Sequence, residues 1–500
     1  MNSSSKIKQG ALFSYVRSFL NILIGLLFTP WLIKSLGSSD YGLYALATSF
    51  VSYFLVDFGL GNSIAKYLAG YRATHKDQDI KDFLGIVYKT YFIICLALFA
   101  IFAIVYFNID SIFNGLTIEE ASKFKYVFII IALYNTLSFP FNTFNGILTA
   151  YEEFAPLRLS EIIQKASMVI LMSLALLLGY GVFALVVVQV ISGVISILYK
   201  YYYVRRCRVE INWRFSNSKK IKEILSFSLW VCLLGICIQL IYGFQTTILG
   251  IASDTKNISV YNISHTIYGF IYVFASGLNG LFLPRLSYIE NESNSIEKIN
   301  NLMTKVGRLQ LLLLGLLISG FFVYGKEFLM LWVGEEYNDA YLAGLFLIIP
   351  TLIVLTEEIP TTLLYVKGNI KVRAIMYVFA TIVCSVVAYF LAPIYGAIGV
   401  GAAVCFGILC FDIIGMNIVY KKKMGINIGS FIKDCHLKFM IPLVLCISLG
   451  LFLKSTCPIE SWFNLGWETL CYSGCYLLIM WLLFMNNYEK DIILSIFKKK

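Results

Sequence analysis

Long apolar stretches dominate this sequence, and only short polar connections separate them. A helix needs roughly 20 mostly apolar residues to cross a bilayer. Only 14% of the residues are charged and 59% are hydrophobic, whereas soluble domains have about 25% and 45–50%. The sequence therefore predicts an all-α polytopic membrane protein with about 14 transmembrane helices. The fourteen candidate spans are 10–33, 41–65, 84–107, 125–149, 157–178, 181–203, 223–249, 258–283, 306–325, 340–366, 374–392, 396–420, 439–454 and 466–486.

Basic residues gather in alternate connections. With the N-terminus inside, 31 of the 40 Lys and Arg residues fall in inner segments and six in outer loops. Three more, Arg17, Lys89 and Lys165, lie within spans. Because positively charged loops stay cytoplasmic, we expect both termini in the cytoplasm and an even number of spans.

The longest inner connection, 200–222, contains eight basic residues and follows the sixth span. Glycine-rich patterns after the first span recur weakly at an offset of about 215 residues. We therefore predict two six-helix lobes around a central cavity, as in many transporters, with two extra C-terminal helices. The predicted divisions are 1–204 (N-terminal lobe), 205–222 (cytoplasmic basic linker), 223–421 (C-terminal lobe) and 422–500 (two extra helices and a basic tail).

Three segments carry a family resemblance: Pro30–Tyr71, Val260–Phe270 and Leu283–Ser287. They resemble the polysaccharide-unit flippases of the multidrug/oligosaccharidyl-lipid/polysaccharide exporter superfamily. The first segment matches that pattern at Pro30, Leu36-Gly37, Tyr41-Gly42, Gly59-Leu60, Ser63 and Lys66.

The resemblance implies a function in transport. Such a protein flips undecaprenyl-diphosphate-linked oligosaccharide repeat units (O-antigen, capsule or exopolysaccharide) across the bacterial inner membrane by alternating access. It would not be an enzyme, and we expect neither a cofactor nor a metal. The expected partners are the lipid-linked oligosaccharide, membrane lipids and the polysaccharide polymerase machinery, and we expect a monomer.

Cations inside the predicted spans of the first lobe are candidates for binding an anionic headgroup, because ionisable groups in a membrane are costly. Arg17 lies about two turns into its span, where a guanidinium suits bidentate binding of a diphosphate. Related flippases carry a cavity arginine in the first helix. Lys89 and Lys165 are further candidates, and Asn145 and Gln239 offer hydrogen bonds to sugars. The alternatives are snorkelling for Arg17 and Lys89, a Glu161–Lys165 pair, and interhelical hydrogen bonds for the amides.

Isolated carboxylates in spans are candidates for ion coupling, since a carboxylate can stay in lipid by taking up a proton. Asp57 and Asp412 each stand alone in their spans. Glu357 lies between Pro350 and Pro360, which should kink that span. When the Lys and Arg residues at span ends are assigned to the adjoining loops, the spans of the second half contain only acidic charges.

Several other functions are disfavoured. The sequence contains no P-loop, HExxH, GxSxG or dinucleotide motif, and no basic nucleic-acid module. A membrane glycan polymerase or ligase usually needs a larger outer loop than 108–124. A cation-coupled multidrug exporter of the same fold remains the alternative transporter.

Overall fold

The structure is a computed structural model that describes residues 3–54, 60–73, 77–213, 218–275, 286, 288–290, 294–456 and 458–498. Nearly all of these residues are helical, and none of them forms a β-strand. The predicted all-α fold is therefore confirmed. Two compact units divide the chain, Met1–Asn262 and Ile263–Lys500.

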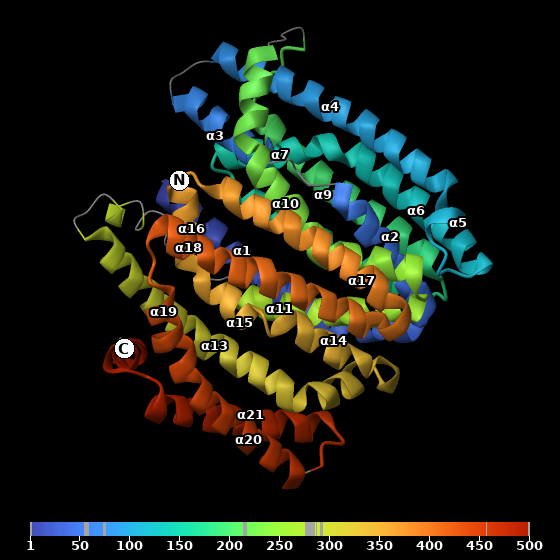
Figure 1. Cartoon of the computed structure of the whole chain (residues 1–500). Coiled ribbons are helices and arrows are strands. Elements are labelled where there is room, and N and C mark those ends of the chain that lie inside the picture. The colour runs from blue at the N-terminus through green and yellow to red at the C-terminus, as the bar shows by residue number, and fades with distance from the viewer. Residues whose placement is uncertain are drawn as a thin grey trace. The chain divides into compact units, whose positions relative to one another are not determined.

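The first unit is a bundle of long helices linked by short turns (Figure 1). Within it, α8 packs on α9 and on α1, while α3 packs on α7. Its helices are α1 (Ser3–Leu36), α2 (Ser38–Phe54), α3 (Leu60–Ala73), α4 (Asp77–Phe107), α5 (Ile109–Ile112), α6 (Ile118–Ser138), the 3₁₀ turn η1 (Phe139–Asn142), α7 (Thr143–Ala150), α8 (Phe154–Leu177), α9 (Val182–Arg206), α10 (Ser218–Ala252) and the first part of α11 (Thr255–Ala275).

The boundary between the units lies inside α11 and beyond the predicted linker 205–222. Helix α10 belongs to the first unit because it packs against α2 and α3. The sequence analysis instead assigns residues 223–262 to the second lobe. A compact unit of the fold need not coincide with a lobe that moves during transport. The layout of the lobes therefore stays a prediction.

The second unit contains several broken helices. Its elements are α13 (Ser295–Trp332), η3 (Glu335–Tyr337), α14 (Asp339–Ile348), α15 (Thr351–Val354), η4 (Leu355–Glu357), α16 (Glu358–Val366), α17 (Ile370–Gly407), the π-helix η5 (Ile408–Gly415), α18 (Met416–Met424), α19 (Ile428–Phe431), the π-helix η6 (Ile432–Leu437), α20 (Lys438–Thr456), α21 (Trp462–Leu483) and α22 (Asn487–Lys498). Both α20 and α21 pack against α13.

Ten helical stretches of the described chain are long and apolar enough to cross a membrane. One of them, Ile370–Met424, contains a turn at Gly396 with φ 53° and ψ −131°. This left-handed φ suits a residue without a Cβ atom, and the turn lies at the first residue of the predicted span 396–420, just after the span 374–392. The protein is thus a multi-pass membrane protein, while the count of fourteen spans stays a prediction.

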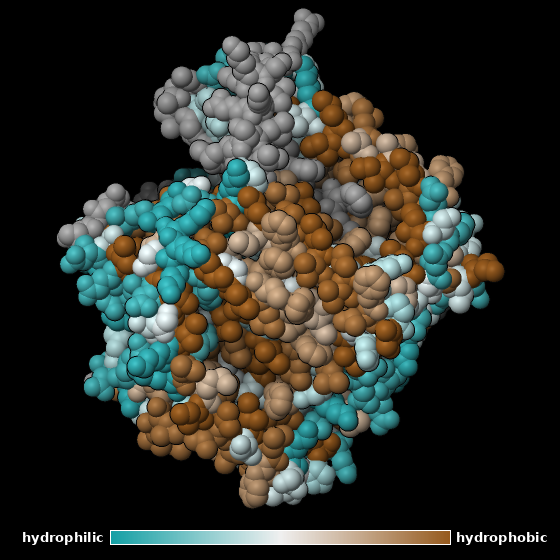
Figure 2. Space-filling model, in the orientation of Figure 1, coloured by the Kyte–Doolittle hydropathy of each residue, from teal (hydrophilic) through white to brown (hydrophobic). Residues whose placement is uncertain are grey.

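The surface of the second unit matches a lipid environment. Figure 2 shows a broad apolar area over α17, with hydrophilic residues gathered beyond the helix ends. Large apolar side chains are exposed along α17, including Phe379, Phe390 and Ile394. In water such a patch would exceed what soluble monomers tolerate, so the folded chain needs lipid around it.

Candidate functional site

A buried polar cluster lies in the second unit. It is formed by Glu357 in η4, Arg373 and Tyr377 in α17, Asp412 in η5 and Asn417 in α18. The side chains of Glu357 and Asp412 are 3% and 8% exposed. Buried ionisable groups in a membrane protein mark functional sites more often than structural ones.

Local breaks in helical geometry place the two carboxylates. Pro350 and Pro360 interrupt their span, as predicted: the chain passes from α14 through α15 and the 3₁₀ turn η4 before α16 begins. A proline inside a helix removes one backbone donor and crowds the preceding turn. Asp412 lies in a π-helical segment, and such segments occur frequently at functional sites.

Hydrogen bonds connect the cluster in two parts. Arg373 Nη2 donates to the hydroxyl of Tyr377 at 3.2 Å, and this hydroxyl donates to Asp412 Oδ2 at 2.5 Å. The spacing of Arg373 and Tyr377 is i, i+4, which puts both on one face of α17. In the second part, Asn417 Nδ2 donates to Glu357 Oε1 at 2.7 Å.

Two polar atoms of the cluster lack a partner. Arg373 Nε and Asn417 Oδ1 are buried and make no hydrogen bond in the part of the chain that the structure describes. Glu357 is within electrostatic range of both Asp412 and Arg373. Unpartnered buried polar atoms are uncommon in native proteins and call for an explanation.

Arg373 corrects one sequence prediction. The charge count places Arg373 in a cytoplasmic connection and predicts that the spans of the second half contain only acidic charges. The structure instead begins α17 at Ile370 and places Arg373 one turn into the helix, half-buried with its Nε atom fully buried, beside Tyr377 and Asp412. The one signal in the sequence is the isolated Asp412, for which a hydrogen-bond partner on another helix is an alternative to a bound proton.

The candidate substrate residues of the first unit lie on four helices: Lys89 on α4, Asn145 on α7, Lys165 on α8 and Gln239 on α10. All four side chains are half-buried. Gln239 Nε2 donates to Ser52 Oγ on α2 at 2.8 Å, which is the interhelical alternative. Asn145 Oδ1 is buried and without a hydrogen-bond partner among the described residues, so it retains capacity for a ligand.

Three further predictions concern the first unit. Arg17 lies on α1, but its side chain is outside the described part of the structure, and Asp57 lies outside the described residues altogether. The structure pairs Glu161 with Arg158, at 3.2 Å and one turn earlier, instead of with Lys165. The expected Glu161–Lys165 pair is therefore not the ion pair observed there.

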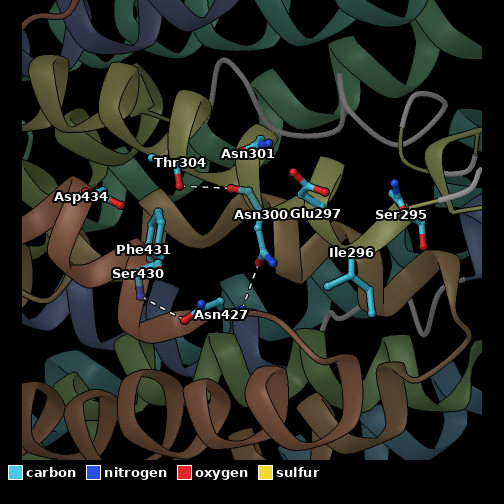
Figure 3. Close-up of a pocket in the computed structure, with 11 residues that line it drawn as sticks. Ser295, Ile296, Glu297, Asn300, Asn301, Thr304, Asn427, Ser430, Phe431 and Asp434 are labelled. Atoms are coloured by element: carbon cyan, nitrogen blue, oxygen red, sulfur yellow. Dashed lines mark hydrogen bonds between the residues drawn. The ribbon is translucent and has the colours of Figure 1, made fainter.

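A separate polar pocket of about 740 Å³ lies where the start of α13 meets α19 and η6. Figure 3 shows the side chain of Asn300 pointing toward the backbone of Asn427, and Asn300 Oδ1 accepts a hydrogen bond from the backbone N–H of Asn427 at 3.1 Å. Amide and hydroxyl side chains predominate in its lining, together with the ring of Phe431. None of the predicted site residues lines this pocket.

Comparisons with known proteins agree on the type of protein. The sequence profile of the family described as Polysaccharide biosynthesis protein matches residues 7–290. The chain is also similar to a candidate O-antigen transporter of Shigella flexneri, with 23% identity over 375 residues, covering 74% of this chain and 87% of that protein.

Two solved structures share the fold. The lipid II flippase MurJ in an inward closed conformation aligns with a TM-score of 0.72 at 15% identity, covering 97% of this chain and all of that one. An inward-facing multidrug resistance MATE family transporter of the MOP superfamily aligns with a TM-score of 0.64 at 16% identity, covering 85% and 99%. At these identities the similarity establishes the fold alone.

Proposed function

Because the chain belongs to the family described as Polysaccharide biosynthesis protein, we propose that it flips an undecaprenyl-diphosphate-linked oligosaccharide repeat unit across the bacterial inner membrane. The predicted resemblance to the polysaccharide-unit flippases is confirmed at the level of the family. The observation that carries the proposal is this family membership, combined with similarity to a candidate O-antigen transporter over most of both chains.

The proposed mechanism is alternating access between two lobes, with both termini in the cytoplasm. On this proposal, cations of the first lobe bind the diphosphate. Arg17 is the main ligand, and Lys89 and Lys165 add positive charge. Asn145 and Gln239 contribute hydrogen bonds to the sugars. The free Oδ1 of Asn145 supports this role for that residue. Glu357 and Asp412 couple transport to an ion, and Asp57 is a third candidate for coupling.

A multidrug exporter is the rival function, because the MATE transporter shares the fold. The two functions differ in what a deletion strain accumulates. A flippase deletion should accumulate the lipid-linked unit on the cytoplasmic side and lose surface polysaccharide, whereas an exporter deletion should become sensitive to toxic cations. Normal surface polysaccharide in a strain without a redundant flippase would refute our proposal.

Arg17 provides the sharpest test of substrate binding. A snorkelling arginine tolerates lysine, since lysine also reaches the interface. A diphosphate-binding arginine does not, because lysine lacks the planar two-pronged geometry. Hydrogen bonds to charged groups contribute about 1.5–3 kcal/mol, which corresponds to roughly a ten- to hundredfold change in binding.

The test measures export in strains that carry the variants at normal membrane abundance. Arg17→Lys and Arg17→Ala should each lower the export rate roughly ten- to hundredfold. Lys89→Ala should lower it much less. Full export by Arg17→Lys would favour snorkelling, and full export by Arg17→Ala would exclude any role in binding. Loss of the variant from the membrane would instead indicate that Arg17 serves folding.

A further inference from the structure

The cluster of the second unit contains two carboxylates but one guanidinium. The Arg373 guanidinium reaches Asp412 through the hydroxyl of Tyr377. Glu357 accepts its hydrogen bond from the neutral amide of Asn417. Among the described residues of the cluster, the charges therefore leave one buried carboxylate without a cation of its own.

Such a carboxylate must take up either a proton or a metal cation to remain in a membrane interior. The guanidinium is always charged, and it acts electrostatically on both Glu357 and Asp412. With both carboxylates ionised, Glu357, Asp412 and Arg373 together carry one net negative charge, which one bound proton cancels. One oxygen of each carboxylate already accepts a hydrogen bond, and a proton can bind the other oxygen without disturbing it. A metal cation instead needs several oxygen ligands at once.

We propose that Arg373 is the resident cation of this cluster, and that Glu357 and Asp412 share one exchangeable proton in place of a metal cation. With the proton bound, one carboxylate is neutral and the other is matched by Arg373. With the proton released, both carboxylates are ionised and compete for one guanidinium. The buried, unpartnered Nε of Arg373 supplies a donor for a second arrangement. Only the role of this site in driving transport rests on the proposed function.

Other titratable groups face the cluster from neighbouring elements: Tyr272 on α11, Glu358 on α16, Tyr420 on α18 and His436 on η6. Glu358 accepts a hydrogen bond from Thr362 at 3.0 Å. His436 Nε2 lies 3.2 Å from Thr356 Oγ1, one residue before Glu357. Histidine titrates near neutral pH, so His436 is the group that an experiment must separate from the carboxylates.

The test is infrared difference spectroscopy of the purified full chain in lipid nanodiscs, which detects the C=O stretch of protonated carboxyl groups. In the wild-type protein, part of this band should disappear as the pH rises, and Na⁺ added at constant pH and ionic strength should not change it. Glu357→Gln and Asp412→Asn should each lose that part, because the remaining carboxylate then matches the guanidinium. Arg373→Gln should enlarge the band, because both carboxylates then require a proton.

His436→Gln is the matched control and should keep the wild-type band. Glu468 on α21 is also buried with both carboxylate oxygens unpartnered among the described residues, so it adds a background common to every variant. Three results would overturn the proposal: a pH-dependent band that Glu357→Gln and Asp412→Asn leave intact, a wild-type band that Na⁺ removes, or a pH response lost in His436→Gln. Because the measurement needs no substrate, it is independent of the export assays that test the proposed function.

Discussion

The buried Arg308 allows a quantitative prediction about the C-terminal helices. Arg308 on α13 forms a bidentate ion pair with Glu489 on α22, with Nε–Oε1 and Nη2–Oε2 distances of 2.5 and 3.0 Å. Its other hydrogen bonds go to the backbone carbonyls of Phe484 and Asp434. The two charged side chains are 7% and 1% exposed. This ion pair therefore fastens α22 and the preceding turn to α13.

The perturbation is Glu489→Ala. Removing one partner of a buried pair costs about 3–5 kcal/mol, because the other charge stays buried and unpaired. Since each 1.4 kcal/mol is a factor of ten, the population of molecules with α22 undocked should rise roughly a hundredfold to a few thousandfold. Local opening of this kind is reported by proteolysis when opening is fast relative to cleavage.

The assay is limited trypsin cleavage at Lys490 in the purified full chain. Glu489→Ala should be cleaved faster by that factor, while the double variant Arg308→Met/Glu489→Met should return close to the wild-type rate, because no buried charge remains. Lys438→Ala is the control: it removes an exposed pair with Asp434 in the same region, worth about 0.3–0.5 kcal/mol. Wild-type cleavage of Glu489→Ala, or a double variant as labile as the single one, would refute the reasoning.

Two further predictions concern topology and packing. Labelling of single introduced cysteines should find Ser218 and Lys422 cytoplasmic but Ser253 and Asn338 external; Ser218 and Ser253 reacting from the same side would contradict the predicted crossing of 223–249. Gly42→Ala should lower the free energy of unfolding in detergent by about 1–3 kcal/mol, because the added Cβ atom would lie 2.4 Å from the carbonyl oxygen of Thr255. Gly269→Ala, with no atom within 4 Å, should be neutral or stabilising by up to about 1 kcal/mol, and equal losses in both variants would refute the packing argument.

The sequence alone predicts where most of the helices lie, because a run of apolar residues is a local signal that lipid imposes on each span separately. It also predicts the break near Glu357, since the effect of proline on a helix is local. The family follows from short patterns around Leu36-Gly37 and Tyr41-Gly42, which the family profile bears out.

The partners of the buried charges could not be predicted in the same way. Arg308 pairs with Glu489, which is 181 residues away in the sequence, and Asp412 binds Tyr377, which is 35 residues away. Both arginines lie near the start of an apolar run, where hydropathy assigns a charge to the adjoining loop. Such a position is equally compatible with an orientation signal and with a buried ion pair, and only the packing of neighbouring helices distinguishes them.

The hydrogen bonding of the Arg308 and Arg373 guanidiniums distinguishes their roles. All three nitrogens of Arg308 donate to protein acceptors, and a fully satisfied polar network holds a single arrangement. Arg373, by contrast, donates to one tyrosine hydroxyl and keeps a buried Nε without a partner among the described residues, so it retains a donor for a second arrangement. Arg308→Lys should therefore speed trypsin cleavage at Lys490, because lysine cannot reproduce the forked geometry. Arg373→Lys should leave that cleavage unchanged and instead move the pH range in which the carboxyl band disappears. If Arg373→Lys loosens α22 as much as Arg308→Lys does, the two arginines share a structural role and the distinction fails.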